Sequence, residues 1–272
     1  MNHKPLITSL QNPIVKQIVR LQQKASERVK TALFVAEGRR EVSLALSKGI
    51  EIEQILISEE IYREDSFYPI ETGGIHKLIF VSRSVYNKMA YRQDAEGVIM
   101  IGKQKPLTPD KLQLPEDALV LVLEGVEKPG NLGAIFRTAD AAGVNALILA
   151  DAAADIYNPN AIRASLGCVF TVPAVSCSTR DAIAWLKDLS RWPGQKLPKI
   201  HAAILQTDTF YYDIDMKGAT ALVFGAEDTG LTQAWREAAH QLIKIPMSGA
   251  IDSLNVGASV AVLCFEARRQ RQ

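Results

Sequence analysis

The chain has 272 residues, of which 47% are apolar and 22% charged, with three cysteines and a net charge of +1. This composition is ordinary for a globular protein of about two domains, and it excludes the disordered, collagen-like and disulfide-stapled classes. No stretch approaches the roughly 18 consecutive apolar residues of a membrane helix, and residues 1–13 lack the basic and then apolar layout of a signal peptide. We therefore expect a cytoplasmic protein that spans no membrane.

The cysteines are Cys168, Cys177 and Cys264, and no two of them form a C-x-x-C pair. An odd number of cysteines without metal-ligand spacing is typical of small buried hydrophobic residues in a reducing compartment. The sequence thus predicts neither a redox pair nor a metal site.

The charge is unevenly distributed along the chain. Residues 1–40 hold eight Lys or Arg against two Glu, a net charge of +6, so the remaining residues carry −5. The net charge of +1, taken alone, argues against a strongly basic nucleic-acid binder. The uneven distribution shows, however, that the N-terminal segment is basic.

Asn12 followed by proline predicts a helix start, and apolar residues then repeat at helical spacing. Lys16, Arg20 and Lys24 recur every four residues, which places them together on a separate face. That face is either an ordinary solvated surface or a surface that meets phosphate, and the residues alone leave both interpretations open.

Short apolar runs alternate with helical patterns over residues 30–102, which predicts a small α/β layer structure. Residues 103–117 hold three prolines and almost no apolar periodicity, as a linker does. Beyond them a second alternation predicts a mostly parallel sheet covered by helices on both faces. The expected strands there are 118–126, 145–151, 169–175, 201–206, 221–227 and 242–247, and the expected helices are 131–143, about 181–190, 232–240 and about 254–271.

Three loops that follow predicted strands combine glycine with hydrogen-bonding side chains. They are 127–133 with Arg137 beyond it, 224–231 with the adjacent acids Glu227 and Asp228, and 245–256. Each alone is compatible with an ordinary turn, with Asn131 or Ser253 capping the helix that follows. Because loops after parallel strands meet at one edge of the sheet, where ligands bind, we expect the three together to form a site.

A dinucleotide site is the competing interpretation of the first loop. Asp151 ends a predicted strand about twenty residues after Gly130, as does the acid that holds a ribose in such sites. The loop reads G-x-x-G, however, and lacks the close-approach glycine of G-x-G-x-x-G. A nicotinamide-dependent enzyme is therefore kept only as an alternative.

The three loops and the segments around them resemble motifs one, two and three of the SpoU (TrmH) family of RNA ribose 2′-O-methyltransferases, within the SPOUT superfamily. The matching segments, in the family's order and spacing, are NLGAIFRTADAAG, LVFGAEDTGL and IPMSGAIDSLNVGASVAVLCFE. The resemblance covers about residues 117–270. Residues 34–58 are similar, more weakly, to the small ribosomal-protein-type RNA-binding domain that often precedes this catalytic domain.

The resemblance implies a C-terminal trefoil knot, S-adenosylmethionine as cofactor and a homodimer with the site at its interface. The domains would be an RNA substrate-binding domain at 1–104, a linker at 105–116 and a methyltransferase domain at 117–272. The implied cofactor-binding residues are Leu205, Gly225, Gly230, Ile245, Met247 and Leu254, and the implied catalytic group is Asn131, Arg137, Glu227, Ser253 and Asn255. RNA would be bound by Lys16, Arg20, Lys24 and Arg39.

Two residues depart from the family pattern: Lys128 stands where an Asp is common, and Asp228 where a glycine is frequent. Arg137 matches the residue often drawn as the general base, but a guanidinium has a pKa above 12 and accepts no hydrogen bond. We expect Arg137 to stabilise the developing alkoxide instead, with Glu227 and Asn131 holding the loop geometry.

The expected function is S-adenosylmethionine-dependent methylation of a ribose 2′-hydroxyl in structured RNA, with 23S rRNA favoured over tRNA as the substrate. A tRNA methyltransferase and a non-catalytic RNA-binding protein that keeps the fold are the alternatives. The target nucleotide is not legible in the sequence.

Overall fold

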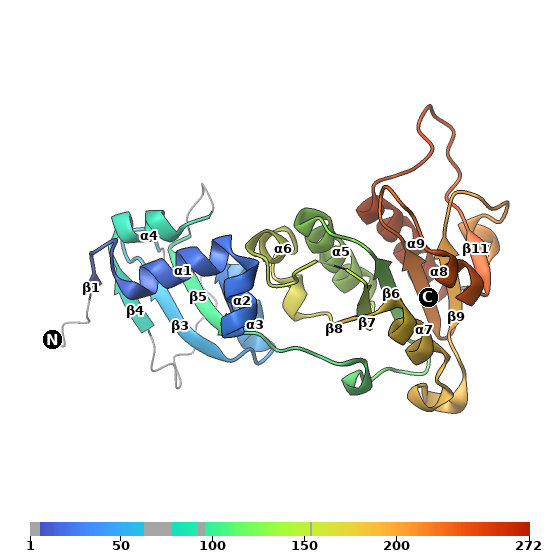
Figure 1. Cartoon of the computed structure of the whole chain (residues 1–272), viewed down its shortest axis with the longest axis horizontal. Coiled ribbons are helices and arrows are strands. Elements are labelled where there is room, and N and C mark those ends of the chain that lie inside the picture. The colour runs from blue at the N-terminus through green and yellow to red at the C-terminus, as the bar shows by residue number, and fades with distance from the viewer. Residues whose placement is uncertain (1–5, 63–77, 92–95, 153) are drawn as a thin grey trace. The chain divides into compact units, whose positions relative to one another are not determined.

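The computed structural model of the chain describes residues 6–62, 78–91, 96–152 and 154–272 (Figure 1). The chain divides into two compact units. The first unit comprises residues 1–105 together with 155–171, and the second comprises 106–154 together with 172–272. Over the described ranges, no helix is both long and apolar enough to cross a bilayer.

The first unit is a mixed sheet with strand order β1-β4-β3-β5-β2 and helices on its faces. Its strands are β1 (Leu6–Ile7), β2 (Leu33–Glu37), β3 (Ile52–Ile57), β4 (Leu78–Val81) and β5 (Val98–Lys103), and its helices are α1 (Pro13–Gln23), α2 (Ala25–Thr31), α3 (Arg39–Ser47), α4 (Arg83–Met89) and α6 (Pro159–Ala164). Strand β5 is antiparallel to β2 and β3, whereas β4 is parallel to β1 and β3. Strand β4 begins at Leu78, within the apolar run at 76–82, and residues 76–77 of that run lie outside the described residues.

Helix α1 has the cap and the buried stripe that the sequence predicts. The Asn12 Oδ1 accepts a hydrogen bond from the Ile14 N–H at 2.9 Å, and Pro13 opens the helix. Val15, Ile18 and Leu21 are buried in one cluster with residues of α4 and the sheet. The opposite face of α1 is therefore left for polar and basic side chains.

Residues 155–171 fold with the first unit, although they lie within the range 117–272 that the sequence assigns to the second domain. The Tyr157 and Phe170 rings pack on Phe34 of β2 at centroid distances of 4.8 and 5.5 Å. The Asp155 carboxylate also accepts a hydrogen bond at 2.6 Å from Nε of buried Arg28. Covering Phe34 and pairing Arg28 are long-range requirements that no local sequence pattern reveals.

The second unit is a parallel sheet with strand order β11-β9-β10-β6-β7-β8. Its strands are β6 (Leu119–Glu124), β7 (Ala146–Ala150), β8 (Ala174–Cys177), β9 (Lys199–Ala203), β10 (Thr220–Phe224) and β11 (Gln241–Ile243), and its helices are α5 (Pro129–Ala142), α7 (Thr179–Lys187), α8 (Gln233–Ala238) and α9 (Val256–Gln270). The 3-10 turns of the described chain are η2 (Pro109–Lys111), η3 (Cys168–Phe170), η4 (Leu189–Arg191), η5 (Pro193–Gln195) and η6 (Tyr211–Asp213).

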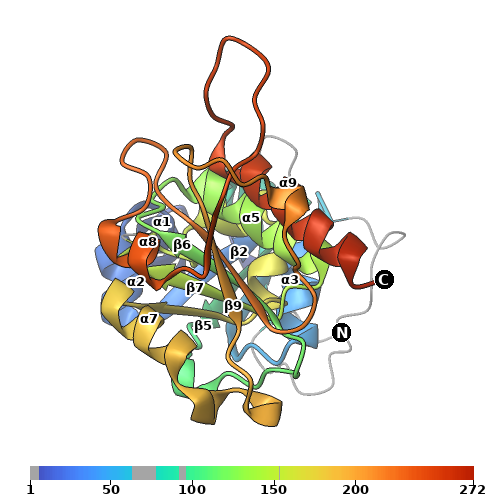
Figure 2. The ribbon, with the colours of Figure 1, turned by 90° about the vertical axis from the view of Figure 1, so that its right-hand side faces the viewer.

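Helices cover both faces of this parallel sheet, as the apolar strand sequences require. Helices α5 and α9 pack together on one face, and α7 and α8 lie together on the other (Figure 2). Trp185 of α7 and Trp235 of α8 are buried against the sheet on their side. The expected parallel α/β architecture of the C-terminal domain is confirmed.

Several expected boundaries are wrong in detail. The strand expected over 169–175 begins only at Ala174, because residues 168–170 form η3 in the first unit. The strand expected over 242–247 ends at Ile243, ahead of a proline that cannot donate to a sheet ladder. Within the expected linker, Leu107 forms a bridge with Val175 of β8, so this segment packs on the second unit instead of hanging free.

Candidate functional site

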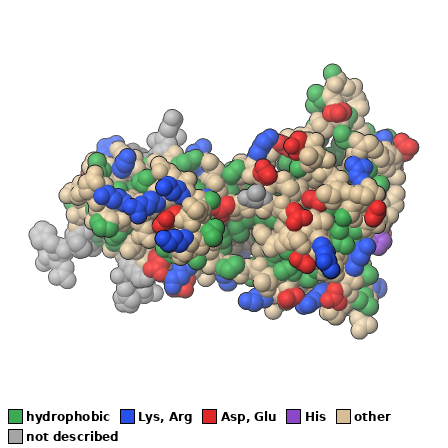
Figure 3. Space-filling view, in the orientation of Figure 1, with side chains coloured by type: hydrophobic (Ala, Val, Ile, Leu, Met, Phe, Trp, Pro, Cys, Tyr) green, Lys and Arg blue, Asp and Glu red, His purple; other side chains and the backbone are tan. Residues whose placement is uncertain are grey.

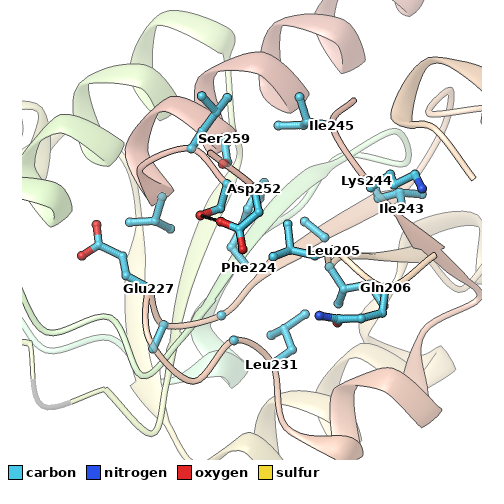
Figure 4. A pocket seen from close by; sticks show the side chains of 18 of the residues that line it. Leu205, Gln206, Phe224, Glu227, Leu231, Ile243, Lys244, Ile245, Asp252 and Ser259 are labelled. Atoms are coloured by element: carbon cyan, nitrogen blue, oxygen red, sulfur yellow. Dashed lines mark hydrogen bonds between the residues drawn. The ribbon is translucent and has the colours of Figure 1, made fainter. Parts of the chain in front are cut away.

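A pocket of about 250 Å³ opens at the carboxyl end of the second sheet, where the loops after β9, β10 and β11 meet (Figure 4). The six residues expected to bind cofactor all line it: Leu205, Gly225, Gly230, Ile245, Met247 and Leu254. Glu227, Asp228 and Ser253 line it as well. Two of the three loops that the sequence singles out, 224–231 and 245–256, therefore meet at this pocket, and the loop after β9 supplies its remaining wall.

Gly225 and Gly230 shape the loop after β10 by letting its two ends approach. A Cβ atom on Gly225 would lie 2.2 Å from the carbonyl carbon of Gly230, closer than real Cβ contacts come. Gly230 adopts a φ of +66°, and its N–H donates to the Ala226 carbonyl at 3.0 Å. These glycines close a tight turn that carries Glu227 at its exposed tip.

The pocket has the apolar walls and open backbone groups that an adenosine-containing cofactor needs. Leu205, Met247 and Leu254 supply apolar side chains at its rim. Among the described residues, the backbone groups of Ile245, Met247 and Leu254 make no hydrogen bond, so their N–H and C=O groups remain available to a ligand. The residues present thus fit S-adenosylmethionine.

A polar cluster joins the first turn of α5 and the loop after β10 to the start of α9. The Glu227 carboxylate accepts hydrogen bonds from the side-chain amides of Asn131 at 2.8 Å and Asn255 at 2.7 Å. Asn255 also donates to the Asn131 Oδ1 at 3.3 Å, and its own Oδ1 accepts from the Gly257 N–H at 2.9 Å. Three of the five expected catalytic residues are therefore in direct contact.

Lys128 completes this cluster as an ion-pair partner of Glu227. The hydrogen bond from Lys128, and then its positive charge, lower the pKa of the Glu227 carboxyl, and the same hydrogen bond to Glu227 raises the pKa of Lys128. The Lys128 side chain is 73% exposed, so solvent screens this pair. In the sequence Lys128 stood out only as a departure from the family pattern. In the structure it is the ion-pair partner of Glu227.

Arg137 and Ser253 do not join the polar cluster. Arg137 is exposed on α5, six residues beyond Asn131, which is about 9 Å along the helix axis. Within the described chain it makes no hydrogen bond or ion pair, so its guanidinium is open to solvent. The Ser253 hydroxyl bonds with Asp252 at 3.2 Å, on the loop that lines the pocket.

The ordinary capping roles considered for two of these residues are wrong. Helix α5 begins at Pro129, so Asn131 lies inside its first turn and its amide is free to contact Glu227. Helix α9 is capped by Asn255 and not by Ser253. Asn255 thus combines a structural role with membership of the polar cluster.

Glu124 is a buried acid that sequence reasoning missed. It lies at the end of β6 and accepts hydrogen bonds from the Thr179 hydroxyl at 2.9 Å and from the Thr232 N–H and hydroxyl at 2.8 Å. It thereby ties the start of α7 to the end of the loop after β10. A carboxylate directly after an apolar strand is the signal that would have found it.

Asp151 has a structural role as well, which removes the support for a dinucleotide site. Its carboxylate accepts a hydrogen bond from the Thr179 N–H at 3.0 Å. The residue adopts a φ of +47° at the turn after β7. The acid that a ribose would need is therefore engaged in holding the turn that starts α7.

The residues expected to bind RNA lie on the first unit. Lys16, Arg20 and Lys24 are exposed, with Lys24 just beyond the end of α1, and Lys and Arg side chains gather over α1 and α2 (Figure 3). Arg39, at the start of α3, is half-buried and its guanidinium lies 4.8 Å from the Tyr62 ring centroid. Arg39 is therefore less accessible than Lys16, Arg20 and Lys24, and its guanidinium already contacts an aromatic ring.

The cysteines behave largely as the sequence predicts. Cys168 and Cys264 are buried and Cys177 is half-buried, all as free thiols. Burial raises the pKa of Cys264 to about 12 and also raises that of Cys177, so neither is an activated thiolate. Over the described residues, no cluster of His, Cys, Asp and Glu could hold a metal ion.

Comparison with known families assigns both parts of the chain. Residues 118–265 match the model of the SpoU rRNA Methylase family, and residues 12–100 match that of the MRM3-like substrate binding domain. Because the first match spans more than half of the chain, the protein belongs to the SpoU rRNA methylase family.

Relatives and solved structures agree over nearly the whole length. The chain is 29% identical to the 23S rRNA (uridine(2479)-2'-O)-methyltransferase of Streptomyces viridochromogenes, covering 90% of this chain and 86% of the relative. It is similar to an RNA 2'-O ribose methyltransferase crystal structure, with 36% identity, a TM-score of 0.82 and coverage of 98% and 99%. The AdoMet-bound rRNA methyltransferase of Sinorhizobium meliloti is 32% identical with a TM-score of 0.83 and covers 97% of each chain.

Proposed function

We propose that this protein transfers the methyl group of S-adenosylmethionine to a ribose 2′-hydroxyl of ribosomal RNA. The observation that carries the proposal is the convergence of an apolar pocket with open backbone groups and the cluster of Asn131, Glu227 and Asn255 at one sheet edge. Relatives of similar length act on 23S rRNA, and a structural relative binds AdoMet. 23S rRNA is therefore the favoured substrate.

The chain's own residues supply alignment and charge. S-adenosylmethionine, when bound, supplies a methyl group already activated by the sulfonium charge. Leu205, Gly225, Gly230, Ile245, Met247 and Leu254 hold the cofactor in this proposal. Glu227 fixes the loops through Asn131 and Asn255, so that the ribose hydroxyl is positioned against a rigid wall.

Arg137 stabilises the alkoxide that develops on the ribose oxygen. Its support is the exposed guanidinium on α5, which no described group engages and which cannot serve as a base at neutral pH. Ser253 and Asn255, on the third loop, complete the polar side of the site.

The proposal includes a division of labour between a substrate-binding domain at 1–104 and a methyltransferase domain at 117–272, with 105–116 between them. The match of 12–100 to a substrate binding domain supports it, as does the exposed basic face of α1. Residues 155–171, although within the range of the methyltransferase domain, pack on the first unit and so form part of the proposed RNA-binding unit.

The knot, the dimer and the cellular site are further parts of the same proposal. A trefoil knot is favoured by family membership and by the meeting of the loops after β9, β10 and β11 at one pocket. A homodimer is favoured by the exposed apolar side chains Phe265 on α9, 50% exposed, and Ile251, 63% exposed. A substrate in ribosomal RNA favours the cytoplasm as the place where the protein acts.

The test is transfer of radiolabelled methyl from S-adenosylmethionine to purified rRNA, followed by mapping of 2′-O-methyl sites in RNA from cells with and without the gene. We expect one 23S position to lose its methyl group without the gene. Labelling of tRNA alone would contradict the choice of substrate. Cofactor binding without transfer to any RNA would favour a non-catalytic RNA-binding protein.

A further inference from the structure

A second cavity, of about 470 Å³, lies within the first unit and is lined by residues of three segments. Helix α1 supplies Val19 and Gln22, the end of α4 and the residues after it supply Lys88 and Tyr91, and the start of α6 supplies Asn158 and Asn160. The residues lining it include no carboxylate. The cavity is distinct from the candidate cofactor site, since none of its residues belongs to the second unit.

Tyr91 is an exposed aromatic residue with a fixed backbone. Its side chain is 45% exposed, while its N–H donates to the buried Glu37 carboxylate at 2.7 Å. The Arg163 guanidinium lies over the ring, 5.8 Å from its centroid. Arg163 belongs to α6, so the ring and the cation are brought together only because residues 155–171 fold onto the first unit.

The chemistry of the cavity matches an unpaired nucleotide. An aromatic face stacks any base, and an arginine beside it adds a planar cation for stacking or for phosphate. Amides both donate to and accept from the edges of bases. Gln22 Nε2 already donates to the Met89 carbonyl at 2.7 Å and Asn158 Oδ1 accepts from the Asn160 N–H at 2.9 Å, which leaves the Gln22 oxygen, the Asn158 amide N–H groups and the Asn160 side chain for a base. The Lys88 ammonium and the basic residues Arg20 and Lys24 on and beside α1 supply charge for the backbone.

We propose that this cavity binds one unstacked base of the RNA substrate, with the base stacked on Tyr91. The inference rests on the proposed function, since it assumes that the first unit reads RNA, and it adds a particular subsite to that role. It also gives a functional reason for the packing of residues 155–171 on the first unit, because this segment supplies the amides of Asn158 and Asn160 to the cavity and Arg163 to the Tyr91 ring.

The probe is a short single-stranded RNA with one 2-aminopurine, whose fluorescence is quenched on stacking. With wild-type protein we expect quenching on binding. Tyr91→Ala should abolish the quenching and weaken binding about 5- to 150-fold, the range that stacking of one base accounts for. Tyr91→Phe should keep both, because the ring remains.

Tyr212→Ala is the matched control, because Tyr212 is 48% exposed and lies on the second unit. It should leave quenching and affinity unchanged. S-adenosylmethionine affinity and the melting temperature should stay at wild-type values in Tyr91→Ala, which separates a lost subsite from misfolding.

Unchanged quenching and affinity in Tyr91→Ala would overturn the subsite, whatever the outcome of methyl transfer. Loss of both in Tyr91→Phe as well would also contradict it, since stacking survives that change. Wild-type protein that quenches the probe but methylates no RNA would refute the proposed function alone. Wild-type protein that does not bind the RNA probe would refute the choice of RNA as the ligand of this cavity.

Discussion

Glu227 is the residue on which the geometry of the candidate site depends. Its carboxylate accepts from Asn131 on α5 and from Asn255 at the start of α9, and pairs with Lys128. The adjacent acids Glu227 and Asp228 in a glycine-bracketed turn marked this loop as a candidate in the sequence. The partner itself could not be predicted, because it comes from a segment almost a hundred residues away.

Replacing Lys128 with Met should move the acidic limit of activity to higher pH. Lys128 lowers the pKa of Glu227, so without it this carboxyl protonates at a higher pH, and the neutral group accepts the two amide hydrogen bonds more weakly there. The measurement is the pH profile of methyl transfer, with Lys128→Arg as the charge-preserving control.

An acidic limit that is the same in wild type and Lys128→Met would show that the exposed ion pair is fully screened and has no influence on Glu227. Activity at neutral pH should remain close to wild type, since the carboxyl is ionised there in both proteins.

Arg137→Lys should retain part of the methyl-transfer rate, whereas Arg137→Met should lose about 100- to 1,000-fold, the usual cost of removing one charge-stabilising donor. The positive charge survives in the lysine variant, and stabilisation of an alkoxide needs charge more than a particular shape. S-adenosylmethionine affinity, measured by calorimetry, should not change in either variant.

A lysine variant as inactive as the methionine variant, with cofactor affinity intact, would contradict electrostatic stabilisation. It would favour a strict requirement for the guanidinium fork or a role as a base.

Among the elements, β9 carries an unusual buried histidine. His201 is 4% exposed, and neither ring nitrogen has a hydrogen-bond partner among the described residues. Burial, with smaller contributions from Lys199 and His240, lowers the pKa of His201 to about 4, although Asp215 acts in the opposite direction. The neutral ring is therefore the form that the folded strand accepts.

This histidine should make the fold sensitive to mild acid. Between pH 6.5 and pH 4 the unfolded chain binds a proton that the folded chain does not, so stability falls as pH falls through that window. The expected loss between pH 7 and pH 5 is about 2 kcal/mol from His201 alone, at roughly 1.4 kcal/mol per pH unit. Urea unfolding at the two pH values measures it.

His201→Leu should remove most of that pH dependence, while substitution of His240, which is exposed and makes only a small contribution to the pKa of His201, should preserve most of it. The same acid sensitivity in wild type and His201→Leu would assign the effect to other groups.

Periodicity and caps predicted most elements, but they failed where long-range packing decides. Asn12 and the stripe of α1 were predicted because cap and helix period are local. The cap of α9 was placed at Ser253, but Asn255 caps the helix by accepting from the Gly257 N–H, because the helix begins two residues later than the local pattern indicates. Residues 168–170 are as apolar as a strand would be, but they form η3 within the first unit, where the Phe170 ring packs on Phe34 of β2.

At the scale of the whole molecule, the sequence predicted two α/β parts and the meeting of three loops, since strand and loop order fix which loops share a sheet edge. It could not predict that residues 155–171 leave the second unit, because Phe34 and Arg28, which hold them, are far away in sequence. Arg28 also shows that the charge of the first 40 residues is not all available, since its side chain is buried in an ion pair.

The exposed part of that charge leads to a prediction for RNA binding. Substituting Lys16, Arg20 and Lys24 together with Glu should weaken RNA binding and flatten its dependence on salt. Each phosphate contact contributes about 0.7 to 0.9 to the slope of log affinity against log salt, so three lost contacts should reduce the slope by about 2 or more. The measurement is a salt titration of RNA affinity, with cofactor affinity expected to be unchanged.

The matched control changes Arg180, Lys187 and Lys196, which are exposed on the second unit, to Glu and so alters the net charge equally. If net charge alone governs binding, both triple variants should lose the same affinity and slope. If the face of α1 meets phosphate, only the first should lose slope, because counterions are released where contacts form and not in proportion to total charge. Equal losses, or an unchanged slope in the first variant, would refute the assignment of this face to RNA.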